Sequence, residues 1–92
     1  MKKKEKQLAE TALRLLHRSY DMHLQARREY YNAKFIQDPD IREKKLSATK
    51  EVYDYCMSTF SDPEVLRFRE YFKENNRPEF EEILSRPLYK LI

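Results

Sequence analysis

The chain contains no glycine, and its first proline is Pro39. Because glycine and proline are the residues that most often end a helix, the sequence before Pro39 can form one long helix. We predict this helix over residues 3–37, with a length of about 50 Å at 1.5 Å per residue. The absence of glycine also excludes the Gly-rich loops that bind phosphates and dinucleotides.

The prolines mark the limits of the remaining helices. Asp38-Pro39-Asp40 and Asp62-Pro63-Glu64 each place a capping aspartate before a proline and follow it with an acid near the positive end of the helix dipole. Asn75-Asn76-Arg77-Pro78-Glu79 is a weaker form of this signal, and Pro87 ends the segment that starts there. We therefore predict helices over residues 39–61, 63–74 and 78–86, and no strand.

These elements predict one all-α domain over residues 1–92. It would be an antiparallel helical bundle with a long N-terminal helix, a second helix that packs back on it and two short C-terminal helices. Residues 1–6 are expected to be a frayed basic start. Residues 87–92 form an apolar segment, termed the tail, which needs cover from the bundle or from another chain.

Steps of three and four residues separate the faces of the first helix. A polar stripe is predicted to face solvent: Gln7, Thr11, Arg14, Arg18, Asp21, Gln25, Arg28 and Asn32. A stripe of small side chains at seven-residue intervals, termed the seam, would let another helix approach closely: Ala12, Ser19, Ala26 and Ala33. A further stripe is apolar: Leu13, Tyr20, Leu24, Tyr31 and Phe35.

The second helix is predicted to cover part of the first with two adjacent sets of side chains. One set is Ile41, Ala48, Val52, Tyr55 and Thr59, and the other is Thr49, Tyr53, Cys56 and Phe60. Because the second helix is the shorter one, the chain is expected to leave some apolar surface of the first helix uncovered.

This surplus of apolar surface favours association with proteins. The predicted interface comprises the seam, side chains that flank it and the tail: Ala12, Leu15, Ser19, Met22, His23, Ala26, Tyr30, Ala33, Leu88, Tyr89, Leu91 and Ile92. We predict a small regulator, inhibitor or assembly factor that binds a protein partner or forms a homodimer. If the seam instead receives the chain's own second helix, the apolar stripe from Leu13 to Phe35 remains for outside contacts.

Nucleic-acid binding is an alternative, because residues 1–46 carry a net charge of +5 and residues 47–92 a net charge of −2. The cations that would contact phosphates are Lys2, Lys3, Lys4, Lys6, Arg14, Arg18, Arg27 and Arg28. Tyr30 and Tyr31 lie among these cations, but on a helix they point into the apolar stripes. We therefore predict that both rings pack in the core instead of stacking on bases.

The side-chain chemistry predicts neither catalytic nor metal-binding residues, and no cofactor. Apolar neighbours are expected to raise the pKa of the Cys56 thiol, and the two histidines lack a cluster of cysteines to complete a metal site. A single cysteine fits a reducing compartment, and no apolar run is long enough to span a bilayer. We predict a cytoplasmic protein without membrane contact.

The long first helix followed by Asp38-Pro39-Asp40-Ile41-Arg42-Glu43 resembles the all-helical chorismate mutases. The resemblance covers one helix and six residues. It implies an enzyme in which two interlocked helices hold a dianionic substrate between inward-pointing Arg and Lys side chains. Here Arg27 and Lys34 border the apolar stripes, whereas the other arginines of the helix fall on the polar stripe. This enzyme is an alternative to the interaction module, which remains our prediction.

Overall fold

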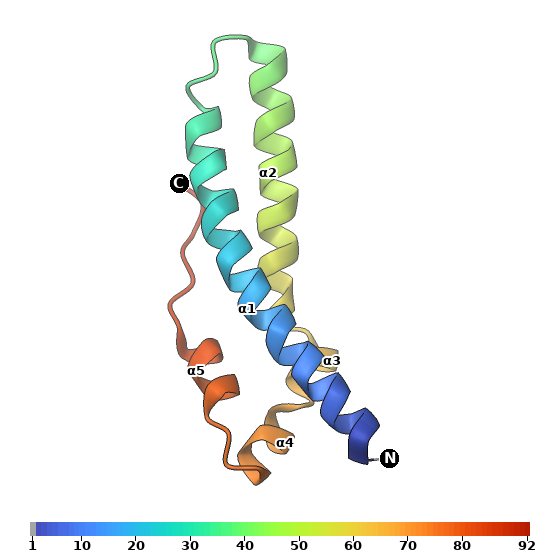
Figure 1. The fold of residues 1–92 in the computed structure, drawn as a ribbon. Helices are drawn as coiled ribbons and strands as arrows, with labels where there is room; N and C mark the ends of the chain where they lie inside the picture. Colours follow the sequence, from blue (N-terminus) through green and yellow to red (C-terminus); the bar gives the residue numbers. More distant parts are fainter. Residues whose placement is uncertain (1) are drawn as a thin grey trace.

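The computed structural model describes residues 2–92, with side chains from Lys3 onward, and all regular structure in this range is helical. The helices are α1 (Lys2–Ala33), α2 (Pro39–Thr59), α3 (Pro63–Leu66), α4 (Arg69–Glu74) and α5 (Glu79–Ser85). Figure 1 shows α1 and α2 as an antiparallel hairpin, with α3, α4 and α5 beside the N-terminal half of α1. The predicted all-α bundle is confirmed. Within residues 2–92, every helix is too short or too polar to cross a bilayer.

The aspartate–proline pairs start helices where they were predicted. The Asp38 carboxylate accepts hydrogen bonds from the backbone N–H groups of Asp40 at 2.9 Å and Ile41 at 3.3 Å. The Asp62 carboxylate accepts one from the N–H of Glu64 at 3.0 Å. Each carboxylate therefore satisfies donors that the first turn of a helix leaves without a backbone partner.

Two predicted helices differ from those in the structure, each for its own physical reason. The first helix ends at Ala33 instead of residue 37, because the N–H groups of residues 34–36 bond to carbonyls only three positions back and tighten the turn into α2. The predicted helix over residues 63–74 is divided, and Phe68 (φ −85°, ψ −1°) lies between α3 and α4. This break accompanies the burial of Val65, Phe68 and Phe72 in one cluster, so tertiary packing outweighs continuous helical bonding.

A chain without glycine must use another residue where the backbone turns left-handed. Asn76, between α4 and α5, takes this conformation with φ 54°. Asparagine tolerates it better than most residues with a Cβ atom. The turn brings α5 back against α1.

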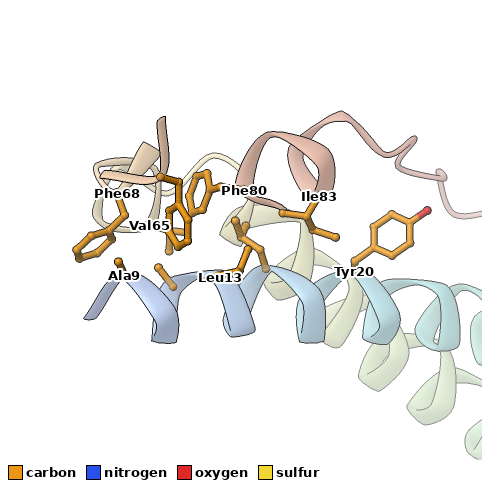
Figure 2. Packing of buried hydrophobic residues seen from close by; sticks show 10 residues of the cluster. Ala9, Leu13, Tyr20, Val65, Phe68, Phe80 and Ile83 are labelled. Carbon is orange, nitrogen blue, oxygen red and sulfur yellow. The ribbon is translucent and has the colours of Figure 1, made fainter. Parts of the chain in front are cut away.

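The main core is an aromatic and aliphatic cluster at the N-terminal half of α1 (Figure 2). Phe72 and Phe80 are almost fully buried, and their rings stack at 5.0 Å between centroids with an interplanar angle of 19°. Their neighbours are Ala9, Ala12, Leu13, Leu16, Tyr20, Val65, Phe68 and Ile83. The short C-terminal helices therefore cover this half of α1.

The remainder of the hairpin extends beyond the main core, and residues 21–56 are termed the arm. In the described part of the chain, the Cα atoms extend 54 × 23 × 15 Å, so the molecule is far longer than it is thick. The arm is built from the second half of α1 and from α2 (Figure 1). Among the described residues outside the hairpin, the tail is the segment that runs beside the arm (Figure 1), which leaves more of the arm's surface in contact with solvent.

The seam packs inside the chain. All four of its side chains are buried, and the Ser19 hydroxyl donates a hydrogen bond to the Thr59 hydroxyl of α2 at 3.2 Å. On α2 the second predicted set is buried at Thr49, Tyr53 and Cys56. Of the first set, Thr59 is buried, whereas Ile41, Val52 and Tyr55 are exposed. The prediction that this first set covers α1 is therefore wrong for most of its length, because these side chains lie on the side of α2 that faces solvent. The polar stripe of α1 is exposed at every predicted position.

Candidate functional site

The tail lies along the arm and is held there through its backbone. The Tyr20 hydroxyl of α1 donates a hydrogen bond to the Pro87 carbonyl at 3.2 Å. The Tyr53 hydroxyl of α2 donates one to the Tyr89 carbonyl at 2.7 Å. The tail therefore contacts both helices, and we term the surface beneath it the tail groove.

Two cations, one on α1 and one directly after it, extend this pattern toward the tip of the arm. The Arg27 guanidinium donates a hydrogen bond to the Lys90 carbonyl at 2.9 Å, and the Lys34 ammonium donates one to the Ile92 carbonyl. Charged donors make stronger hydrogen bonds to carbonyls than neutral donors do. These are the two cations that the sequence places at the border of the apolar stripes, and in the structure they bind the tail.

His23 is the buried centre of the tail groove. Its Nε2 atom accepts a hydrogen bond from the Tyr89 N–H at 3.3 Å, so this nitrogen carries no proton. The proton therefore lies on Nδ1, which donates it to the Tyr20 carbonyl. Both ring nitrogens are satisfied in one neutral tautomer, and the imidazole fixes the position of the tail backbone.

Aromatic and cationic contacts add side-chain recognition to these backbone bonds. The Tyr89 ring stacks on the His23 ring at 6.3 Å between centroids and an interplanar angle of 12°, and the Arg27 guanidinium lies 5.6 Å from the centre of the Tyr89 ring. The Tyr20 ring meets His23 edge-on at 4.8 Å. Figure 2 shows the Tyr20 hydroxyl turned away from the main core, and its partner is the tail. Tyr20 thus connects the core to the groove.

An exposed apolar surface borders the tail on α1. Leu24, Tyr31 and the tail residue Ile92 line a shallow hollow of about 290 Å³ together with Arg27 and Arg28. One turn farther along, Phe35 is 68% exposed, and its ring meets the Tyr31 ring edge-on at 5.3 Å. The prediction that Tyr31 packs in the core is wrong, because α2 covers the seam of α1 and leaves Tyr31 exposed, and the short C-terminal helices pack on the other half of α1.

A second apolar surface lies at the opposite edge of the arm. Met22 and Val52 line a small hollow of about 220 Å³ between α1 and α2 with Gln25, Ala26 and Glu29. Farther along α2, Tyr55 is 66% exposed and Ile41 is exposed as well. Both edges of the arm therefore present apolar side chains to solvent.

Exposed apolar side chains are concentrated in one part of the molecule. Among the residues that the structure describes, every large apolar side chain with substantial exposure lies on the arm or the tail, with the exception of Leu8. The set comprises Met22, Leu24, Tyr31, Phe35, Ile41, Val52, Tyr55, Tyr89 and Ile92. The surplus apolar surface expected for α1 is thus concentrated in its second half.

Ion pairs between different helices are found at the other end of the molecule. Arg77 donates hydrogen bonds to Glu10 of α1 and, at 2.9 Å, to Glu79 of α5. The hydrogen bond from Arg77 holds the pKa of Glu10 below its usual value. Arg69 likewise bonds to Glu81 and lowers the pKa of that carboxyl. These pairs connect the short helices to each other and to α1.

The chemistry of Cys56 agrees with a structural role. The thiol is buried on α2, and this burial raises its pKa, which disfavours the reactive thiolate. Among residues 3–92, no group of three His, Cys, Asp or Glu side chains is placed to hold a metal ion.

The structure separates the predicted interface residues into three groups. Five are buried within the chain: Ala12, Ser19, His23, Ala26 and Ala33. Four are partly buried: Leu15, Tyr30, Leu88 and Leu91. Met22, Tyr89 and Ile92 are exposed. The chain therefore uses the seam for its own helix pair, which was the alternative that the sequence left open.

The cations predicted for nucleic-acid contact are spread along α1. The Lys2 side chain lies outside the described set, and Arg27 is partly buried under the tail. The exposed cations are Lys3, Lys4, Lys6, Arg14, Arg18 and Arg28. Arg28 is the exposed member closest in sequence to the exposed aromatic pair Tyr31 and Phe35.

Sequence reasoning missed the residues that bind the tail. Tyr20, His23, Arg27 and Lys34 share one face of α1 at helical spacing, and each has a polar atom that can bond to a backbone. This row of donors and acceptors beside an apolar segment was the available signal. Tyr53 could not be assigned to the same site without knowing how α2 is rotated.

Comparisons of the chain with protein-family models, with curated proteins and with solved structures gave no match.

Proposed function

We propose that this protein is a small helical interaction module that binds a protein partner through its arm. The observation that supports the proposal is the concentration of large exposed apolar side chains on the arm and tail, where all but Leu8 of those in the described residues lie. A contiguous exposed apolar surface costs free energy in water, and such surfaces commonly mark sites of protein association. The main core would hold the hairpin rigid while the arm presents its surface.

The composition of the surface beside the tail supports a protein as the partner. Tyr31, Phe35 and Tyr89 supply large rings, and Arg27 and Arg28 supply planar cations beside them. Tyrosine and arginine are the residue types most enriched among those that dominate binding energy at protein interfaces. Binding would allow the module to inhibit, recruit or assemble its partner, and it would require no catalytic residues.

The buried thiol of Cys56 agrees with a cytoplasmic setting, where cysteines remain reduced. The partner can be a second copy of the chain, since both edges of the arm present apolar side chains that a homodimer would cover.

Photo-crosslinking from defined positions tests the proposal. A photoreactive phenylalanine analogue in place of Phe35, and in a second variant in place of Tyr55, is expected to form discrete protein adducts in cells that express the chain. The matched control carries the same analogue in place of Asn32, an exposed residue of the polar stripe three positions from Phe35. Adducts are expected at Phe35 and Tyr55 and not at Asn32.

Equal labelling from all three positions would contradict the proposal, because it would show contact by random collision. Circular dichroism of each variant verifies the fold. Since Phe35, Tyr55 and Asn32 are all exposed, none of the replacements should alter it.

One observation favours a second candidate, which is single-stranded nucleic acid. Tyr31 and Phe35 are exposed on the same part of α1 as Arg28, so rings and a cation are both accessible. Bases stack on exposed aromatic rings, and arginine contacts phosphates. Binding to a labelled oligonucleotide over a series of salt concentrations tests this candidate, since phosphate contacts weaken as salt increases. No binding at low salt would exclude it.

A further inference from the structure

We propose that the tail groove also accepts the tail of a second copy, so that two chains pair by exchanging residues 87–92. This inference deepens the proposed function, because it names the partner and the residues that each copy contributes. The tail is the segment whose fit to the groove is seen in the structure itself. A second copy brings an identical segment, which would make the same contacts in the groove.

The contacts between tail and groove do not depend on chain connectivity. The groove bonds to backbone atoms of four tail residues: Pro87, Tyr89, Lys90 and Ile92. Four of the five bonds come from side chains of α1 and α2, and the fifth comes from Lys34, directly after α1. Exchange would therefore break and remake the same set of bonds, with no loss of contact between tail and groove.

The chain has a suitable hinge before the tail. Arg86 ends α5 with extended backbone angles of φ −65° and ψ 141°, and Pro87 follows it. In the described chain, the last hydrogen bond between backbone groups joins the Arg86 N–H to the Ile83 carbonyl. Residues 87–92 are thus held to the molecule by side chains, and six extended residues can reach about 20 Å toward a neighbouring molecule.

The exposed surface beside the groove supplies a reason for exchange. In a single chain, the tail stays near its own groove at an effective local concentration of about millimolar. Because exchange replaces the contacts of the tail by identical ones, these contacts alone do not favour the dimer at lower protein concentrations. Exchange places two arms next to each other at the tail. Leu24, Tyr31 and Phe35 border the groove and are exposed in a single chain. Covering these side chains between two copies would favour the dimer through loss of apolar surface from water.

Chemical crosslinking between two singly substituted chains tests the exchange. Arg27→Cys places a thiol in the groove, and Lys90→Cys places one on the tail residue whose carbonyl Arg27 contacts. The two variants are mixed, unfolded, refolded together and treated with a short bis-maleimide. The native Cys56 is buried and its raised pKa disfavours the thiolate, so it is protected from the reagent.

We expect a crosslinked product of twice the single-chain mass that contains one copy of each variant. Arg18→Cys, which is exposed on the polar stripe, replaces Arg27→Cys as the matched control and should give no such product with Lys90→Cys. Adding Tyr89→Pro to the Lys90→Cys chain should abolish the product, since proline lacks the N–H that bonds to His23. Tyr89→Ala keeps this N–H and should retain part of the yield.

Light scattering of the unmodified chain provides the second readout. A molar mass that rises from one chain toward two chains with concentration, together with the mixed crosslink, supports exchange. A dimer without the mixed crosslink would overturn exchange and leave association through the arm intact. Exchange would also be overturned by a molar mass that stays at one chain up to millimolar concentration, with no mixed crosslink. In that case, photo-crosslinked adducts of other proteins at Phe35 would still support the proposed function.

Discussion

The two halves of α1 show how the same kind of sequence acquires different roles. In the first half, Leu13 and Tyr20 are buried under α5 and its neighbours. In the second half, Leu24, Tyr31 and Phe35 continue the same stripe but are exposed. The difference lies in what the rest of the chain places over each half. A main core stabilises one end of the molecule, and the other end keeps an apolar surface exposed to solvent.

The two ends also differ in how they are held together. The core end combines stacked phenylalanines with ion pairs between helices. The arm relies on a seam of small side chains and on a buried histidine beneath the tail. Substitutions in each region should therefore affect stability to different extents.

The largest effect is expected for Phe80→Ala in the main core. Phe80 is fully buried and stacks on Phe72, so removing the ring leaves a cavity and should lower the free energy of unfolding by about 4 kcal/mol. Urea denaturation followed by circular dichroism measures the change. Tyr55→Ala on the exposed edge of the arm is the control and should change stability by less than about 0.5 kcal/mol. Equal effects at both positions would remove the distinction between core and arm.

Ala26→Glu tests whether the arm depends on the seam. The position is buried between the hairpin helices, and an unpaired charge there should destabilise the fold by about 3 kcal/mol. Thermal unfolding gives the change, and Ala26→Ser, with the small polar side chain that the seam already has at Ser19, should be much milder. A variant with normal stability would show that the seam is open to solvent.

His23→Leu should loosen the tail more than the core. The substitution leaves the Tyr89 N–H without its acceptor, at a cost of about 2 kcal/mol. Hydrogen exchange should show faster exchange at Tyr89 and unchanged protection at Phe72 and Phe80. Tyr53→Phe removes only the bond to the Tyr89 carbonyl and serves as a milder comparison. Uniform loss of protection throughout the chain would indicate that groove and core form one cooperative unit.

The smallest effect is expected for Glu10→Gln at the core end, about 1 kcal/mol at neutral pH. Arg77 lowers the pKa of Glu10 relative to its usual value, so the ionised carboxylate stabilises the folded state. This contribution is present above the usual carboxyl pKa and is lost as pH falls through the lowered pKa of the folded state. Wild type and variant should therefore differ in stability at pH 7 and converge in strong acid. Glu5→Gln, on the same helix and exposed, is the control.

Much of the local structure was predictable because it depends on neighbouring residues. The caps at Asp38 and Asp62 act within one helical turn, and the exposed stripe of α1 follows from helical periodicity. The division of the predicted helix at Phe68 was not predictable, because helix propensity and spacing both permit a continuous helix there. Packing of Phe68 against the main core accompanies the break.

The candidate site was predictable only in part. The sequence identified the tail as a segment that needs cover and His23 as a residue beside the seam. It did not reveal that His23, Tyr53 and Arg27 bind the tail backbone, since these contacts join residues 36 to 66 positions apart. Exposure of the stripe from Leu13 to Phe35 was an alternative that the sequence left open. That Tyr31 and Phe35 are exposed while Leu13 and Tyr20 are buried was not predictable, because an aromatic or aliphatic side chain has the same preference for burial at either end of a helix.

The sequence by itself determined that the chain is helical, where the capped helices begin and which face of α1 meets water, since these properties follow from interactions within a few residues. The tertiary structure alone decided which half of the apolar stripe is covered and where the tail binds. The physical reason is that burial depends on surfaces brought together from distant parts of the chain, and the covering helices are long enough to reach only one end of α1.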